Sequence, residues 1–389
     1  MSLSDLPDIC LLKIFENVHE AKELIQLSKV CSRWSDLITP RFKRVKYLHL
    51  MDASDAVDYI DVNSLWINPD TKWNYDNLFE LFSNIKIIDT AAFDYHGSYN
   101  LPEIVKNNPQ IKGLIGYFDL KREDYDLSDI EMFVAEFNFD YKKVFRPDHL
   151  KQVSCYYFFT DDLPSFIEYF PNLKRLHLKL CGADGVFYNG PNLSALKILE
   201  LCTSDYIEQE FTGFHFMDFC PSLESAFFRC WARDIYVDES IKNYNLRDLV
   251  IEKAGFYCVA IDNSSKLSWP FLKKLLSKFP NLHHLAIRNF DKLDVSNFDL
   301  EELIKLLPEL KILDLRKCKN VTHKSADFLT KCCVKQNRSI VLYHSLINEP
   351  TEWPKLDTNR ELIVYGFDFM KHCFYETWDL LPYLLDEDK

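Results

Sequence analysis

The clearest pattern along the chain is a recurring triplet of apolar positions with the spacing LxxLxL. The second and third positions alternate, as side chains on one face of a β-strand do. Between triplets stand segments with leucines at i, i+3 and i+4, such as residues 269–279 and 297–307, each followed by a proline. The pattern predicts short strands that alternate with helices. The first positions of the triplets are Val45, Ile85, Ile111, Leu150, Leu173, Leu196, Leu223, Leu246, Leu282 and Leu310.

The spacing of these triplets indicates a repeat architecture. From Ile85 to Leu310 they recur at a mean interval of about 28 residues, within the range of roughly 20–29 typical of leucine-rich repeats. The copies FPNLKRLHLKLC, from Phe170, and LPELKILDLRKC, from Leu307, resemble such repeats. The resemblance implies an α/β fold, a curved solenoid with parallel strands on its concave face. An ordinary α/β domain is the alternative, and the many aligned anchors disfavour it.

The repeat register also predicts the core. Several copies carry a cysteine or another apolar residue eight positions after the first leucine, as cysteine-containing leucine-rich repeats do. Cys181 and Cys318 stand at this position, so we expect both thiols to be unreactive in the native state. The leucines expected to be almost fully buried are Leu176, Leu178, Leu313 and Leu315.

The repeat pattern is weakest near the two ends. Between Met51 and Tyr141 the segments PDTKWNYDN and YDLSDIEMFVAEFNFDYKK interrupt it. After residue 340 the runs IVLYHSL and ELIVYGF are candidates for terminal strands, and WDLLPYLLDEDK is expected to form a capping segment.

The N-terminus predicts three short helices. Pro7 suits the first turn of a helix, where its missing N–H costs nothing. The apolar residues from Ile9 to Val18 cover an arc of about 220°, against the ~100° stripe of an ordinary surface helix. A second helix is expected from Ala21 to Leu27, and a third from Ser28 until Pro40 ends it. So small a module cannot bury this apolar surface alone, so the surface must meet a partner, either the rest of the chain or another protein.

The segment from Leu6 to Trp34 resembles the F-box, with its LP start, the helix LLKIF, the stretch LIQLSKVC and a closing RW. The resemblance implies docking on the Skp adaptor of a cullin–RING ubiquitin ligase. It places an F-box at residues 1–44 and the repeat domain at 45–389. Some of the apolar residues must hold the helices together instead. The expected adaptor-binding residues are Leu6, Pro7, Ile9, Leu12, Ile14, Phe15, Leu24, Leu27, Val30, Cys31 and Trp34.

Composition narrows the functional classes. The net charge of −13 argues against a general nucleic-acid binder, whose affinity comes largely from neutralising phosphates. Only 9 of 389 residues are glycine, and the common glycine-rich phosphate-binding motifs are missing. The chain carries no signal-peptide pattern and no apolar stretch long enough to span a membrane, so we expect a cytoplasmic or nuclear protein with reduced cysteines.

The sequence carries none of the common catalytic or metal-binding motifs. His19 and Glu20 match the first two residues of the zinc-protease motif HExxH, but Glu23 occupies the position of its second histidine. There is no CxxC, and the adjacent Cys332 and Cys333 are poorly spaced to bind one tetrahedral zinc. We therefore expect no catalytic residue, no metal and no cofactor.

Basic residues recur at one position of the repeat. In several copies the residue after the third anchor is basic, and such residues should form a column along the concave face. The column predicts a strip that binds an acidic or phosphorylated segment of a protein substrate. Local pairing with the acids Glu200, Asp248 and Asp314 is the alternative. The candidate substrate-binding residues are Arg175, Lys179, Arg229, Arg288 and Arg316.

Three functions remain in competition. The F-box resemblance favours a non-catalytic substrate-recognition subunit that docks on the Skp adaptor and presents a target for ubiquitination and proteasomal degradation. A leucine-rich-repeat scaffold without a ligase link is the alternative. An enzyme with an unrecognised site is the third possibility, disfavoured by the missing catalytic motifs.

Overall fold

The computed structural model describes residues 3–51, 62–68, 73, 75–90, 101–116, 127–136, 141–181, 186–203, 207–230, 232–253, 268–290, 297–318, 321–344, 369–381 and 384–385. The chain forms two compact units, Met1–Val153 and Ser154–Lys389. The boundary predicted at residue 44 lies inside the first unit. The predicted strand ELIVYGF, residues 361–367, lies outside the described residues.

Unit 1 joins N-terminal helices to a parallel sheet. Its five strands have the order β5-β4-β3-β1-β2, so β1 lies in the interior of the sheet and β2 at its edge. The strands are β1 (Tyr47–Leu50), β2 (Ser64–Ile67), β3 (Ile87–Asp89), β4 (Gly113–Ile115) and β5 (Met132–Glu136). The helices are η1 (Leu3–Asp5), α1 (Asp8–Glu16), α2 (Ala21–Ser28), α3 (Ser32–Phe42), α4 (Tyr75–Leu81), α5 (Leu101–Asn107) and α6 (Tyr141–Val144).

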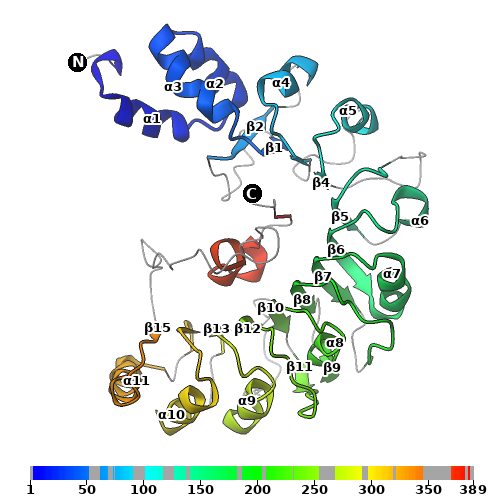
Figure 1. Cartoon of the computed structure of the whole chain (residues 1–389), viewed down its shortest axis with the longest axis vertical. Coiled ribbons are helices and arrows are strands. Elements are labelled where there is room, and N and C mark those ends of the chain that lie inside the picture. The colour runs from blue at the N-terminus through cyan, green and yellow to red at the C-terminus, as the bar shows by residue number, and fades with distance from the viewer. Residues whose placement is uncertain are drawn as a thin grey trace. The chain divides into compact units, whose positions relative to one another are not determined.

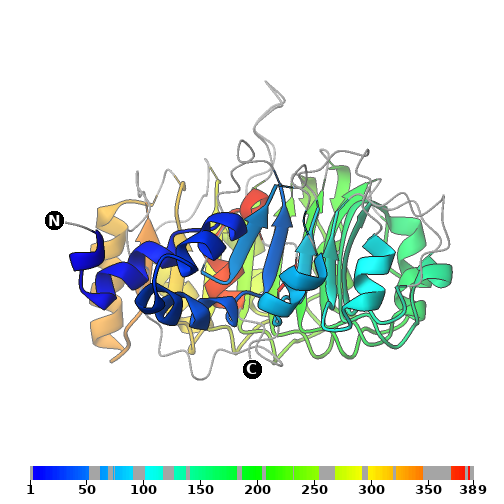
Figure 2. The same ribbon diagram turned by 90° about the horizontal axis from the view of Figure 1, so that it is seen from above.

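The N-terminal helices cover the edge strand β2. The backbone N–H of Trp66 donates to the carbonyl of His19 at 2.8 Å, and Glu20 forms a parallel bridge with Trp66. Phe42, at the end of α3, packs edge-to-face on Phe82 with ring centroids 5.0 Å apart. An uncovered edge strand would expose unpaired backbone groups, so the helices also protect the sheet. Figure 2 shows these helices in blue beside the first strands.

Unit 2 repeats strand and helix in a regular stack. Eight parallel strands have the order β6-β7-β8-β10-β12-β13-β14-β15, and β9 and β11 form a separate pair. The strands are β6 (Gln152–Phe159), β7 (Arg175–Cys181), β8 (Ile198–Thr203), β9 (Ile207–Phe211), β10 (Ser225–Cys230), β11 (Ala232–Ile235), β12 (Asp248–Lys253), β13 (His284–Arg288), β14 (Ile312–Leu315) and β15 (Val341–His344).

Helices follow most of these strands and lie on one side of the sheet (Figure 1). They are η2 (Thr160–Asp162), α7 (Leu163–Tyr169), α8 (Gly213–Met217), α9 (Trp269–Leu276), α10 (Asn297–Leu306) and α11 (His323–Lys335). The C-terminal segment, defined as the described residues 369–381 and 384–385, contains the π-helix η4 (Met370–Phe374) and the 3-10 helix η5 (Trp378–Leu380). This segment, red in Figure 1, lies on the opposite side of the unit 2 strands.

The predicted strand positions are confirmed. Each triplet from Val45 to Leu310 overlaps a strand, and that strand begins two residues after the first anchor of the triplet. IVLYHSL contains the predicted terminal strand β15. Among the described residues, the structure adds four strands that the pattern missed: β2 and β5 in the region of weak repeats, and the separate pair β9 and β11 in unit 2. The sequence VNSLWI around β2 fits the triplet but begins only 17 residues after Val45, too close for a strand and a helix.

Two local predictions need correction. Helix α3 begins at Ser32, not Ser28, and it continues through Pro40 to Phe42. Proline lacks the N–H that would donate to the carbonyl four residues earlier, so the helix loses this bond but continues for two more residues. The predicted capping segment WDLLPYLLDEDK does not start on the last repeat, because its first residue, Trp378, stacks on His177 of β7.

The predicted core is largely confirmed. The four inward leucines of the second and third anchors, Leu176, Leu178, Leu313 and Leu315, are at most 1% exposed. Cys318 is equally buried, whereas Cys181 is only half-buried, at the end of β7. The expected protection of Cys181 therefore has less structural support than that of Cys318.

Candidate interaction surfaces

The inner face of the unit 2 sheet carries charged side chains in register. We define the inner face as the face of β7–β14 opposite helices α7–α11. One row across it comprises Lys179, Cys202, Arg229, Glu252 and Arg288, each paired with the next along the sheet. Arg316 continues the row by register. Ala286 pairs with Asp314, and Arg288 and Arg316 each stand two residues further along their chains. The predicted column therefore exists as a row of neighbouring residues.

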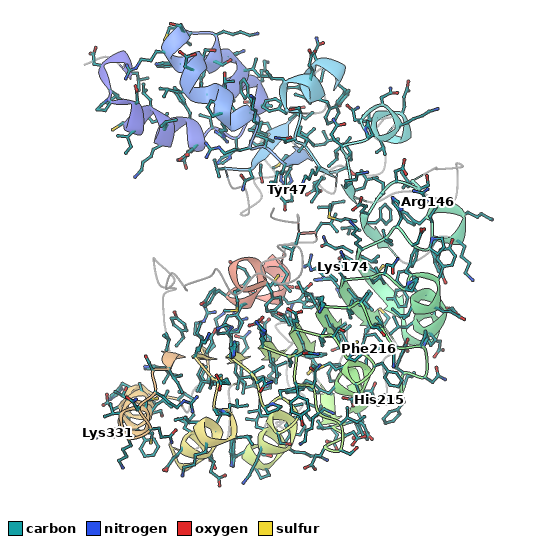
Figure 3. All side chains as sticks on the ribbon, viewed as in Figure 1. Tyr47, Arg146, Lys174, His215, Phe216 and Lys331 are labelled. Carbon is teal, nitrogen blue, oxygen red and sulfur yellow. The ribbon has the colours of Figure 1, made fainter. Side chains whose placement is uncertain are left out.

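This row is not an open strip, and that part of the prediction is wrong. In the row, Arg288 and Arg316 are buried and Lys179 and Arg229 are half-buried. Arg175, which lies outside the row at the start of β7, is also buried. The cover is the C-terminal segment, whose side chains meet those of the inner face (Figure 3). As folded here, the buried guanidinium groups are closed to an external anion. Their role in substrate binding stays a prediction.

The C-terminal segment binds the arginines through main-chain carbonyls and one carboxylate. Arg288 donates to the carbonyl oxygens of Phe374 and Tyr375 at 2.9 and 3.0 Å. Arg316 donates to the carbonyl oxygen of Tyr375 at 2.9 Å and to Asp314. The repeat pattern stops before this segment, so nothing in the sequence indicated these contacts.

Arg229 meets the segment through a charge. Its Nη1 donates to Oδ1 of Asp379 at 2.5 Å, although the Asp379 side chain is 70% exposed. Arg229 also lies 3.7 Å from Glu252 on the neighbouring strand. Burial raises the pKa of Glu252, and the opposing effect of Arg288 and Arg229 does not overcome it. The row thus carries a single acidic residue, Glu252, between the basic residues Arg229 and Arg288.

A second charged cluster lies at the β7–β8 pair. Glu200 accepts hydrogen bonds from Arg175 at 2.7 Å and lies 2.9 Å from Nδ1 of His177. Burial favours the neutral carboxyl group, but Arg175, His177 and the Cys373 thiol together lower the pKa of Glu200. The Cys373 thiol comes from the C-terminal segment, so the segment contributes to stabilising this buried carboxylate.

Serine, aspartate and histidine also meet on the inner face. The Ser225 hydroxyl donates to Oδ2 of Asp248, whose Oδ1 lies 2.6 Å from Nδ1 of His284. In a hydrolase triad the serine would bond to the imidazole, which takes its proton. Here the carboxylate lies between the two, so His284 is not placed as a base for Ser225. We interpret the three residues as a structural network.

The N-terminal helices form the other candidate surface. Helices α1, α2 and α3 pack around a small apolar core in which Phe15 and Trp34 meet edge-to-face, with ring centroids 5.2 Å apart. Arg33 fastens the start of the module by donating to Asp8 at 2.6 Å and to the carbonyl of Leu6 at 2.7 Å. These contacts fix the relative positions of α1 and α3.

Large apolar side chains remain exposed on this module. Ile9 is 69% exposed, Val30 59% and Ile14 41%, and Leu3 is also exposed. Isolated exposed apolar residues are normal, but several on one small module indicate an interaction site. The module therefore keeps an apolar surface that the rest of unit 1 does not cover.

Comparison with known proteins bears on this module. Residues 3–47 match the F-box-like family. Among solved structures, the crystal structure of a TLR13–ssRNA13 complex resembles this chain with a TM-score of 0.38 and 15% identity, covering 78% of this chain. This chain spans 37% of that protein's chain. No curated protein matches the sequence.

The F-box-like module divides the predicted adaptor-binding residues into two groups. Phe15, Leu24 and Trp34 are buried and hold the helices together. The remaining residues reach the surface, either exposed or half-buried, and they are Leu6, Pro7, Ile9, Leu12, Ile14, Leu27, Val30 and Cys31. The structure thus separates the residues that fill the core of the module from those that reach its surface, a division that the sequence left open.

No other kind of site emerges from the described ranges. They contain no group of three or more His, Cys, Asp or Glu side chains placed to hold a metal ion. Within the same ranges, no helix combines the length and the apolarity that crossing a membrane requires.

Proposed function

We propose that this chain is a substrate-recognition subunit of a Skp–cullin–F-box ubiquitin ligase. The F-box-like module would dock on the Skp adaptor, and unit 2 would present a target protein for ubiquitination and proteasomal degradation. Such a subunit needs no catalytic residue of its own, because it acts by bringing the target close to the transfer site.

The observation that carries the proposal is the exposed apolar surface on an F-box-like module. Ile9 and Ile14 project from α1 and Val30 from the turn between α2 and α3, while Phe15 and Trp34 already fill the core of the module. Burying such side chains in a partner contributes roughly 25 cal/mol per Å² of apolar area, before the costs of association. The docking residues we propose are therefore the predicted adaptor-binding residues that reach the surface of the module.

A repeat scaffold without a ligase link is the second candidate. It is favoured by the backbone bonds between His19 or Glu20 and Trp66, since a helical cap on a repeat array would make such contacts. The two functions differ in one testable property, which is binding of the Skp adaptor.

The test is co-purification of the full chain with immobilised recombinant Skp adaptor. Ile9→Asp and Val30→Asp place a charge at exposed apolar positions of the module, and each should reduce adaptor binding at least tenfold. Ile241→Asp and Val334→Asp are matched controls, because these residues are similarly exposed apolar positions in unit 2. Wild-type adaptor binding by both module variants would refute the docking surface. Absence of binding by the wild-type chain would favour the scaffold.

A further inference from the structure

The C-terminal segment occupies the inner face of unit 2 as a bound peptide would. Phe374, Trp378 and Leu381 are buried in one apolar cluster with strand residues such as Phe227 and Val250. The indole of Trp378 stacks on His177 at a centroid distance of 4.3 Å and meets Phe227 edge-to-face at 5.7 Å. The segment therefore packs aromatic side chains against residues of the strands.

The polar contacts of the segment are of a kind that any suitable peptide can make. Arg288 and Arg316 bind main-chain carbonyl oxygens, and Arg229 binds the carboxylate of Asp379. These two carbonyls stand at the end of the π-helix η4, and the last carbonyls of a helix lack partners within it whatever the side chains are. The arginines therefore do not depend on the particular side chains of residues 374 and 375. Specificity would come from the aromatic ring of residue 378 and the carboxylate of residue 379.

The inner face is also unusually charged for permanent burial. Arg175, Glu200, Glu252, Arg288 and Asp314 are each at most 3% exposed beneath or beside the segment. Replacing buried ion pairs by apolar residues is often neutral or stabilising, so a dedicated core gains little from them. Across an interface, by contrast, such charges select the partner and set its register.

We infer that the inner face of unit 2 recognises a partner segment in which an aromatic residue is followed by a carboxylate, and that the C-terminal segment holds this site in cis until such a partner segment displaces it. The inference rests on the proposed function, because it names the class of target that unit 2 would present. It also revises the predicted anion strip, whose arginines would meet carbonyls and a carboxylate flanked by aromatic rings.

The first measurement asks whether the C-terminal segment leaves the inner face without global unfolding. Cys373 lies in the segment and Cys220 in the helix-side core, and both are fully buried. Iodoacetamide labelling of the full chain, followed by mass spectrometry, should modify Cys373 at least tenfold faster than Cys220. Equal labelling rates at both thiols would show that the segment opens only when unit 2 unfolds, and would overturn the inference.

The second measurement uses a fluorescein-labelled peptide with the sequence of residues 369–385, added to the full chain. Asp379→Ala in the chain removes an exposed cis anchor and should tighten peptide binding at least fivefold, because the apparent affinity rises with the open fraction. Asp129→Ala is the matched control: that aspartate is also 70% exposed and pairs with Arg146 at 2.9 Å in unit 1. A peptide with the Trp and Asp of positions 378 and 379 replaced by alanine should bind at least tenfold more weakly.

These outcomes separate the inference from the proposed function. If Asp379→Ala and Asp129→Ala bind the peptide equally, or if the doubly substituted peptide binds as well as the original, the inner face is not such a recognition site. Adaptor binding is measured on the same samples. If the wild-type chain does not bind the adaptor, the ligase role is refuted, but the displacement of the C-terminal segment by a partner segment is unaffected.

Discussion

Trp378 of the C-terminal segment stacks on His177 of strand β7, with ring planes inclined by 26°. The imidazole is enclosed between this indole and the Glu200 carboxylate. Burial lowers the pKa of His177, and the hydrogen bond to Glu200 opposes that effect without reversing it. The stack therefore joins the C-terminal segment to a histidine that is held neutral in the folded state.

This relationship predicts acid sensitivity of unit 2. Because the folded pKa of His177 lies below its ordinary value of 6.5, the unfolded chain takes up the proton first as the pH falls. The free energy of unfolding should be highest above pH 6.5 and should decrease below it. Melting temperatures measured from pH 7.5 to 5.5 should decline less steeply in His177→Gln than in the wild type.

The matched variant for the pH experiment is His323→Gln, since His323 is exposed at the start of α11. Measurements stop at pH 5.5 so that Glu200 does not enter the window. The pKa of Glu200 is lowered from 4.5, and its own stabilising contribution is lost only at more acidic pH. If the melting temperatures of His177→Gln and the wild type fall equally steeply between pH 7.5 and 5.5, the prediction is wrong.

A second prediction concerns the repeat core. Leu313 is fully buried at the centre of β14, so Leu313→Ala removes packed atoms and leaves a cavity. We expect a loss of about 2–5 kcal/mol in the free energy of unfolding of unit 2. Chemical unfolding followed by circular dichroism measures it. Lys311→Ala, an exposed substitution two residues away, should change this energy by less than about 0.5 kcal/mol.

The repeat strands were predictable because their physical cause is local. A triplet is recognised by its alternating apolar positions and by its distance from the next triplet, and both can be read from a single sequence. Strands β2 and β5 were missed for local reasons too. Val62 begins a triplet too soon after Val45, and the β5 triplet uses Ile130, Phe133 and Ala135 in place of leucines.

The cover of the inner face could not be predicted in the same way. The arginine row was correctly placed by register, but its burial depends on Phe374, Tyr375 and Asp379, which lie 59 to 150 residues along the chain from the arginines they contact. No periodic pattern connects such distant residues. In the F-box-like module the sequence could list apolar residues but could not say which of them fill its core.

A third prediction separates folding from docking in that module. Trp34→Ala should destabilise the helices by about 3–5 kcal/mol, because the indole is buried against Phe15. Adaptor binding would then be lost through unfolding of α1–α3 and not through a missing contact. Limited proteolysis should cleave the module of Trp34→Ala faster than that of Val30→Ala, whose side chain is exposed. Equal cleavage rates would contradict the role of Trp34 in holding the helices together.

The last prediction ranks the thiols by reactivity. Cys10 and Cys31 are exposed on the F-box-like module and should react first with a small alkylating reagent. Cys181, half-buried at the end of β7, should react more slowly, and Cys318 slowest of these. Burial also raises the pKa of Cys230 to about 12, so almost no thiolate is present there near neutral pH. Time-resolved labelling read by peptide mass spectrometry gives the order, and rapid modification of Cys318 in the native chain would contradict the repeat register that buries it.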